Sequence, residues 1–141
     1  MSNIIRIEKA NQLPYLANIE KVVAHYPWGI ANITNAFNHQ DTFFAFDDYS
    51  GYYCISLIGD TAELNSIAIL PKAQGDGLGL RLINHMISYC KLHRVKNIFL
   101  EVAVDNVKAK SLYTKVGFRQ INIRSNYYQD GKDAQVMKLI L

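Results

Sequence analysis

A glycine-rich turn between a predicted strand and a long predicted helix constrains this fold more than any other feature. The turn is Gln74-Gly75-Asp76-Gly77-Leu78-Gly79, and it follows Ala62–Leu70, which has the composition of a strand. From Gly77 to Arg94, apolar residues recur at helical spacing, and Asn97–Val104 then has the pattern of an apolar strand. The order predicts a sheet with a helix packed on its face.

The rest of the chain supplies further strands and helices at regular spacing. Short connections between the first strands favour antiparallel hairpins. We expect an α/β (α+β) fold in a single domain over residues 1–141: a mixed, mostly antiparallel twisted sheet of about seven strands with four helices, in the order β-α-α-β-β-β-α-β-α-β-β. The other predicted elements are a strand at Ile4–Glu8, a helix from an Asn11 cap to about Tyr26, a helix at Ile33–His39, strands at Thr42–Asp47 and Tyr52–Ile58, a helix at Asn106–Val116, and strands at Gln120–Asn126 and Ala134–Leu141.

Composition favours a packed globule. Half of the 141 residues are hydrophobic and 19% are charged, no apolar run reaches the roughly 18 residues of a membrane span, and the start lacks a signal peptide's pattern. We therefore expect a soluble cytoplasmic protein with no membrane partner. Cys54 and Cys90 lack metal-type spacing and are expected to be reduced core thiols, and the scattered histidines predict no metal site.

Charge is unevenly distributed along the chain. Residues 1–71 carry three basic and seven acidic side chains, whereas residues 72–141 carry twelve basic and five acidic ones. A polyanionic ligand would prefer the second half, although a solvated lysine-rich face explains the charge alone equally well or better. No compact basic tract indicates direct nucleic-acid binding.

The glycine turn has the composition of a phosphate site. Backbone N–H groups at a helix N-terminus bind phosphate, and Gly75, Gly77 and Gly79 would let the main chain approach a pyrophosphate. No Gly-Lys-Ser/Thr follows, so the turn is not a P-loop. A tight strand-to-helix turn with no ligand is the competing interpretation.

A carboxylate and a phenol follow the turn. Glu101 lies within a strand that we expect to be central and covered on both faces, where an ionised group is costly unless it lines a cleft or has a partner. Desolvation would raise its proton affinity, which suits a general base; a salt bridge to Lys96 or Arg119 is the alternative. Tyr113 is predicted on the inward face of the next helix, where it can be either a catalytic phenol or a core aromatic side chain. Asn106 has the position and residue type of the N-cap of that helix.

These motifs together resemble a known family. Gln74 to Gly79 resembles the Gln/Arg-x-x-Gly-x-Gly/Ala signature of the GCN5-related N-acetyltransferases, and Asn106…Ala109…Leu112-Tyr113…Gly117-Phe118 is similar to their following helix motif. The element order agrees over nearly the whole chain. Within the family, the chain resembles enzymes that acetylate the N-terminal alanine of a small-subunit ribosomal protein, on Tyr26-Pro27-Trp28, Asn65–Ile69, Leu100-Glu101-Val102, Arg124–Tyr128, Asp133-Ala134 and Met137.

The resemblance implies acetyl-CoA as the donor and direct transfer of its acetyl group to an amine, with Glu101 as general base and Tyr113 as general acid. It implies a protein or peptide N-terminus, that of a ribosomal protein, as the acceptor. The implied cofactor residues are Ile67, Ala68, Ile69, Gln74, Gly75, Asp76, Gly77, Leu78, Gly79, Leu80 and Asn106, and the implied acceptor residues are Tyr26, Trp28, Arg124, Asn126, Tyr127 and Tyr128.

Asp76, the acceptor and the catalytic activity each allow more than one interpretation. Asp76 stands where family members often carry Arg or Lys, so we expect it to point to solvent or to weaken cofactor binding. A small-molecule amine is an alternative acceptor, although Trp28, Tyr127 and Tyr128 suit a peptide. A non-catalytic acyl-CoA-binding module is a third hypothesis, which the presence of Glu101 and Tyr113 disfavours.

Overall fold

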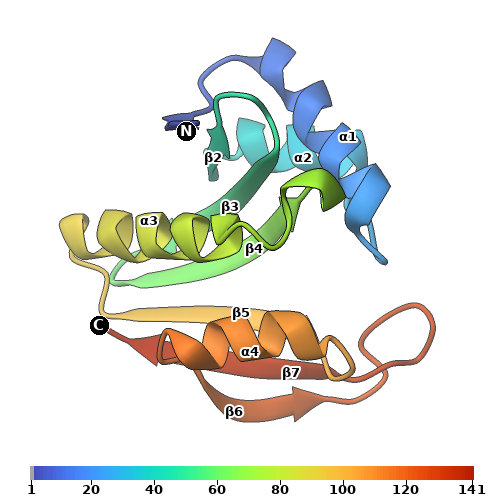
Figure 1. The fold of residues 1–141 in the computed structure, drawn as a ribbon. Helices are drawn as coiled ribbons and strands as arrows, with labels where there is room; N and C mark the ends of the chain where they lie inside the picture. Colours follow the sequence, from blue (N-terminus) through green and yellow to red (C-terminus); the bar gives the residue numbers. More distant parts are fainter. Residues whose placement is uncertain (1) are drawn as a thin grey trace. The chain divides into compact units, whose positions relative to one another are not determined.

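The computed structural model describes residues 2–141 and contains one mixed sheet of seven strands, in the order β1-β2-β3-β4-β5-β7-β6 (Figure 1). The predicted fold class and element order are confirmed. The elements are β1 (Ile4–Arg6), α1 (Leu13–Val23), α2 (Gly29–Asn38), β2 (Thr42–Phe46), β3 (Gly51–Ile58), β4 (Thr61–Ile69), α3 (Leu78–Leu92), β5 (Asn97–Ala103), α4 (Val107–Lys115), β6 (Arg119–Arg124) and β7 (Ala134–Ile140), with 3-10 turns at Ala10–Gln12 and Pro71–Ala73.

The first two helices differ from their predicted limits. Helix α1 has Gln12 rather than Asn11 at its N-cap, because a 3-10 turn at Ala10–Gln12 includes Asn11 and leads directly into the helix. The helix ends at Val23, and α2 begins at Gly29, four residues before the predicted start at Ile33. The connection between the two helices is therefore short and spans residues 24–28.

Strand β5 lies in the interior of the sheet, as predicted. It runs parallel to β4 from Thr61↔Asn97 to Leu64↔Leu100, with α3 as the crossover that parallel strands require. On its other side it pairs antiparallel with β7 over its full length. The buried side chains of the strand include Ile98, Leu100 and Val102.

The chain divides into two compact units. The first contains the described residues through Ser56 with Asn65–Met86, and the second contains Leu57–Leu64 with Ile87–Leu141. Figure 1 shows α1 and α2 side by side in the first unit, where the two helices contact each other. The core of the first unit is formed by Ile7, Leu13, Leu16, Ile19, Ile33, Ala36, Phe43, Ala45, Tyr52, Cys54 and Ala68. Buried residues of the second include Leu64, Ile98, Leu100, Val102, Tyr113, Phe118, Met137 and Leu139. The single-domain expectation stays a prediction.

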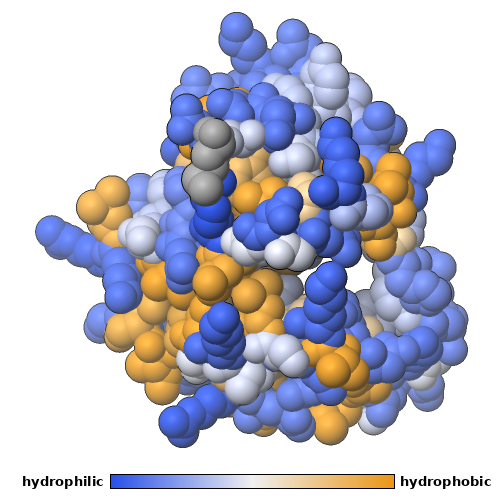
Figure 2. Space-filling model, viewed as in Figure 1, coloured by the Kyte–Doolittle hydropathy of each residue, from blue (hydrophilic) through white to orange (hydrophobic). Residues whose placement is uncertain are grey.

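The surface of the second unit is mixed. Several large apolar side chains there are exposed, among them Leu92, Val107, Ile121 and Ile140. Figure 2 shows apolar surface interspersed with hydrophilic side chains on the unit that carries β5, α4 and β7. Among residues 2–141, no helix is long and apolar enough to cross a membrane.

The two cysteines are free and lie in the core, as the sequence predicted. Neither Cys54 nor Cys90 has accessible surface, and burial raises the pKa of both thiols, that of Cys90 to about 11. At pH 8 the thiolate that reacts is therefore scarce as well as inaccessible.

We predict that both thiols of the native protein react with Ellman's reagent at pH 8 at least about 100-fold more slowly than free cysteine. In guanidinium chloride both thiols should react at once, which provides the control. Rapid labelling of either thiol in the native protein would contradict the buried placement of that cysteine.

Candidate active site

The register of the second unit places Glu101 and Arg124 on one face of the sheet. Glu101 on β5 lies opposite Val136 of β7, and Arg124 on β6 lies opposite Ala134 of β7. Paired residues project to the same side of a sheet, and residues two apart on one strand share a face. Since Ala134 is small, the long Arg124 side chain has room to extend across β7 towards Glu101.

Glu101 and Arg124 form an ion pair. The Arg124 Nη1 atom lies 2.7 Å from Glu101 Oε1, and the guanidinium lies over the Tyr127 ring at 5.2 Å. The alternative interpretation, a salt bridge of Glu101, is therefore found, but with Arg124 rather than with Lys96 or Arg119; Lys96 instead pairs with Asp60. An ion pair this exposed contributes at most about 1 kcal/mol to stability. The pair is therefore more relevant to the reactivity of the Glu101 carboxylate than to folding.

The prediction that Glu101 is buried is also wrong. Its side chain keeps 29% of its surface exposed, although Leu100 and Val102 beside it are buried. The six residues of the edge strand β6 are exposed as well. The Glu101 carboxylate is therefore accessible to an incoming group.

Three tyrosines accompany this ion pair. A hydrogen bond to Glu101 raises the pKa of Tyr127, and burial, with Tyr127 and Glu101 nearby, raises the pKa of Tyr128 to about 12. Tyr113 on α4 is 5% exposed, and burial followed by the proximity of Tyr128 raises the pKa of its phenol. Glu101, Arg124, Tyr127, Tyr128 and Tyr113 thus form one interacting cluster, which we call the Glu101 cluster.

The turn between β6 and β7 positions the two exposed tyrosines. Asn126 adopts a left-handed conformation with φ of 51°, and its N–H donates to Asp133 Oδ1 at 3.0 Å. The Tyr128 N–H donates to the Lys132 carbonyl at 3.1 Å. The Lys132 ammonium pairs with Asp105, and this bond lowers the pKa of the carboxyl group. Asn126 therefore shapes the turn that carries Tyr127 and Tyr128.

The glycine turn belongs to the first unit. The Gln74 side chain donates to the Ile69 carbonyl at 2.9 Å and so braces the turn against the end of β4. Gly75 and Gly77 have φ of 89° and 75°, a region that favours glycine. No heavy atom lies within 4 Å of the position that a Cβ would occupy at either glycine. The main chain is thus open to a ligand at these two positions.

Helix α3 begins at this turn with unsatisfied donors. Its first hydrogen bond runs from Arg81 N–H to the Gly77 carbonyl at 3.1 Å. The N–H groups of Leu78, Gly79 and Leu80 precede that bond and lack an intrahelical acceptor. Asp76 is exposed, in agreement with a carboxylate that points to solvent. The donor set fits a phosphate, and the helix dipole adds to it.

The remaining predicted cofactor and acceptor residues lie on several elements. Ala68 on β4 is buried, while its neighbours Ile67 and Ile69 are half-buried. Tyr26 and Trp28, in the connection between α1 and α2, are half-buried, and Trp28 packs against the core of the first unit.

Asn106 is the N-cap of α4, as the alternative interpretation of its role stated. Its Oδ1 atom accepts a hydrogen bond from Ala109 N–H at 3.2 Å. The backbone N–H groups of the first turn of a helix have no partner within the helix, so this bond stabilises α4. A contact with a cofactor would be an additional role for the same side chain.

Glu20 was not among the residues predicted to form the site. This residue is 2% exposed on α1, and its carboxylate accepts hydrogen bonds from Trp28 N–H at 2.8 Å, from Ser66 Oγ at 2.5 Å and from the Tyr52 hydroxyl. The sequence spacing could have predicted its burial, because Glu20 lies seven residues after Leu13 and therefore on the apolar face of the helix.

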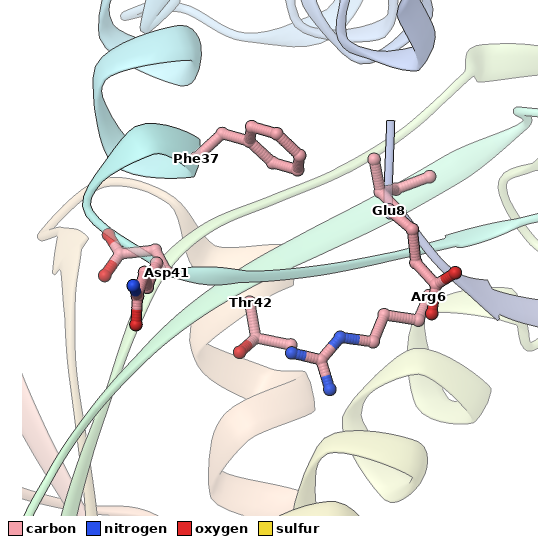
Figure 3. Close-up of a pocket in the computed structure, with 7 residues that line it drawn as sticks. Arg6, Glu8, Phe37, Asp41 and Thr42 are labelled. Atoms are coloured by element: carbon pink, nitrogen blue, oxygen red, sulfur yellow. The ribbon is translucent and has the colours of Figure 1, made fainter. Parts of the chain in front are cut away.

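A separate pocket of about 400 Å³ lies in the first unit (Figure 3). Its lining mixes charges of both signs with an aromatic ring, and it contains no predicted site residue. The lining residues are Arg6, Ile7, Glu8, Phe37, Gln40, Asp41 and Thr42. Among residues 2–141, no group of His, Cys, Asp and Glu side chains is arranged to hold a metal ion.

Comparison with known proteins gives a consistent result. The model of the acetyltransferase (GNAT) family matches residues 8–118. The ribosomal protein bS18-alanine N-acetyltransferase of Escherichia coli K12 is 32% identical over 145 residues, covering 97% of each chain. That of Haemophilus influenzae is 34% identical and covers 91% of this chain and 88% of its own. A Bacillus subtilis relative is 39% identical over 89 residues, which are 62% of this chain and 59% of that protein.

Solved structures agree with the sequence comparison. The crystal structure of the ribosomal-protein-S18-alanine N-acetyltransferase from Escherichia coli matches with a TM-score of 0.92 and 30% identity, covering 99% of this chain and 94% of that one. The NatC complex bound to Gag peptide and CoA matches with a TM-score of 0.84 at 17% identity, which shows the fold alone.

We predict that Asn106→Ala lowers the free energy of unfolding by about 1 kcal/mol, because the N-cap acceptor is lost. Asn106→Asp keeps an acceptor and should stay within about 0.5 kcal/mol of the unmodified protein. Urea unfolding followed by circular dichroism measures both values. Equal stability of Asn106→Ala and the unmodified protein would contradict the capping role.

Proposed function

Because the chain belongs to the GNAT family of acetyltransferases, we propose that it transfers the acetyl group of acetyl-CoA to the N-terminal α-amine of a protein. The observation that carries the proposed chemistry is the accessible Glu101 carboxylate, which is held by Arg124 at 2.7 Å in the same unit as the buried phenol of Tyr113 on α4. A carboxylate can accept the proton of an amine, and a phenol can donate one to a leaving group.

The acceptor is proposed from the relatives. Two proteins named ribosomal protein bS18-alanine N-acetyltransferase match at 32% and 34% identity over nearly their full lengths. We accordingly infer that the acceptor is the alanine N-terminus of a small-subunit ribosomal protein. The exposed Tyr127 with Arg124 stacked on it supports a peptide acceptor, since aromatic rings and guanidinium groups recur in peptide-binding surfaces. The expected cytoplasmic location stays a prediction.

Acetyl-CoA would supply an activated acyl group as a thioester. The donors at the start of α3 and the open glycines fit its pyrophosphate, and the Ile67–Ile69 segment of β4 would hold the pantetheine arm. Asn106 would contact the cofactor from the N-cap of α4.

The proposed step is a direct displacement. The amine nitrogen forms a bond to the thioester carbonyl carbon, the carbon–sulfur bond breaks, and the thiolate of CoA leaves. Glu101 accepts the proton that the amine loses, directly or through one water. Burial raises the pKa of Tyr113, so its phenol is protonated at neutral pH and can donate a hydrogen bond to the sulfur as the thiolate leaves; in the proposed general-acid role the phenol proton then passes to that sulfur.

Amine acidity favours an N-terminal acceptor over lysine. An α-amine has a pKa near 8, so its deprotonation at pH 7 costs about 1.4 kcal/mol. Deprotonation of a lysine side chain, whose pKa is near 10.4, costs about 3 kcal/mol more at the same pH. Glu101 therefore needs to assist a deprotonation that costs little free energy when the acceptor is an α-amine.

We predict that Glu101→Gln lowers kcat/KM for an alanine-starting peptide by about 100-fold or more, because the amide accepts no proton. Tyr113→Phe should lower kcat by a similar factor if the phenol assists thiolate departure. Mass spectrometry of the peptide and release of free CoA measure both. Glu63→Gln and Tyr15→Phe change the same chemical groups at exposed positions and serve as controls. Full activity of both Glu101→Gln and Tyr113→Phe would refute the assigned roles.

We also predict a preference among acceptors. The protein should acetylate a short alanine-starting peptide faster than the same peptide with a blocked N-terminus and an internal lysine, because the α-amine is easier to deprotonate. Spermidine and an aminosugar complete the panel. Acetylation of these amines without the peptide would replace the proposed acceptor with a small molecule, and inactivity towards the whole panel would indicate a binding module.

A further inference from the structure

A carboxylate is buried in the first unit at the centre of a hydrogen-bond cluster. Glu20 follows the buried residues Leu13, Leu16 and Ile19 on α1 and is itself 2% exposed. Its Oε2 atom accepts from Trp28 N–H at 2.8 Å. Its Oε1 atom accepts from the Ser66 hydroxyl at 2.5 Å and from the Tyr52 hydroxyl. Both oxygens of the carboxylate are therefore engaged.

Stability alone does not explain an acid at this position. Removing a carboxylate from water is unfavourable unless hydrogen bonds replace its hydration. Well-packed apolar residues often stabilise a protein as much as a buried charged group does, or more. The Tyr52 and Ser66 hydroxyls lie 2.6 Å apart, so one of them can donate to the other without Glu20. The backbone N–H of Trp28 donates to Glu20 and has no such second acceptor within the cluster.

The three donors lie on different segments of the first unit. Trp28 N–H belongs to the short connection between α1 and α2, which carries the proposed acceptor residues Tyr26 and Trp28. Ser66 lies on β4 immediately before the segment proposed to hold the pantetheine arm, and Tyr52 lies on β3 with no exposed surface. One carboxylate therefore ties the acceptor segment to the strand that leads into the cofactor segment.

We propose that Glu20 is a positioning residue for the acceptor, because its bond to Trp28 N–H holds the 24–28 connection against β3 and β4. This inference rests on the proposed function, which places the acceptor beside Tyr26 and Trp28. Glu20 touches neither substrate in this role. It determines how tightly the peptide binds, and it leaves the chemical step to the Glu101 cluster.

The Glu20→Met variant tests the inference, since methionine fills a similar volume and accepts no hydrogen bond of comparable strength. We expect KM for the alanine-starting peptide to rise about tenfold, the effect of losing one hydrogen bond to a charged group. The kcat value and KM for acetyl-CoA should stay within about twofold, because an acceptor-positioning residue changes mainly peptide binding. Trp28 is the only tryptophan in the chain, so its fluorescence emission reports the connection directly and should shift to longer wavelength.

Two further variants separate positioning from general destabilisation. Glu20→Gln can present its amide oxygen to Trp28 N–H and its amide NH2 to the two hydroxyls, so it should restore KM and the emission maximum. Tyr53→Phe removes a buried hydroxyl, which is bonded to His85 at 2.7 Å, from the neighbouring position on β3. It should lower stability and leave both readouts unchanged. A Tyr53→Phe shift equal to that of Glu20→Met would overturn the inference.

A measurement on the unmodified protein covers the case in which Glu20→Met does not fold. The Trp28 amide should be protected from hydrogen exchange, although it precedes the first intrahelical bond of α2. Exchange as fast as in an unfolded peptide would overturn the inference. Hydrogen exchange and Trp28 fluorescence can be measured whether or not any amine in the panel is acetylated. If no amine is acetylated, the proposed function is rejected, but these two measurements still test the bond between Glu20 and Trp28. Normal acetylation with an unchanged peptide KM in Glu20→Met would reject the role of Glu20 alone.

Discussion

The position of Glu101 depends on the two-sided hydrogen bonding of β5. The strand pairs parallel with β4 on one side and antiparallel with β7 on the other. The second ladder continues to β6 and places Arg124 on the face of Glu101. A shift of one residue in either antiparallel register would turn one of these side chains to the opposite face and separate the ion pair. The strand pairing thus determines which side chains can share a proton-transfer site.

Much of this arrangement could be predicted from the chain itself. The apolar composition of Asn97–Val104 indicated a central strand, and the glycines at 75, 77 and 79 indicated a tight turn between a strand and a helix. Strand β5 is interior, and Gly75 and Gly77 adopt positive φ in that turn. The environment of Glu101 could not be predicted, because alternation identifies a face without saying what covers it. Its ion partner lies on β6, 23 residues later in the chain, and only the strand pairing brings the two together.

Glu20 illustrates the other limit of a periodicity argument. The apolar stripe of α1 was identified from hydrophobic residues alone, so an acid on the same face did not enter the pattern. Its partners come from the α1–α2 connection, β3 and β4. A charged residue in a predicted core stripe is informative for this reason, since burial requires donors that the helix itself does not supply. The two acids thus differ in exposure, since Glu101 is accessible and Glu20 is enclosed, and the roles proposed for them differ accordingly.

A crystal structure with a bisubstrate ligand, in which CoA is joined through an acetyl bridge to the N-terminus of an alanine-starting peptide, would locate both substrates relative to Glu101. We expect the acceptor nitrogen within hydrogen-bond reach of the Glu101 carboxylate, about 2.6–3.2 Å or one water away. We also expect the Tyr113 hydroxyl at the sulfur and the pyrophosphate at the start of α3. An acceptor nitrogen more than one water away from Glu101, with another base beside it, would show that Glu101 is not the general base.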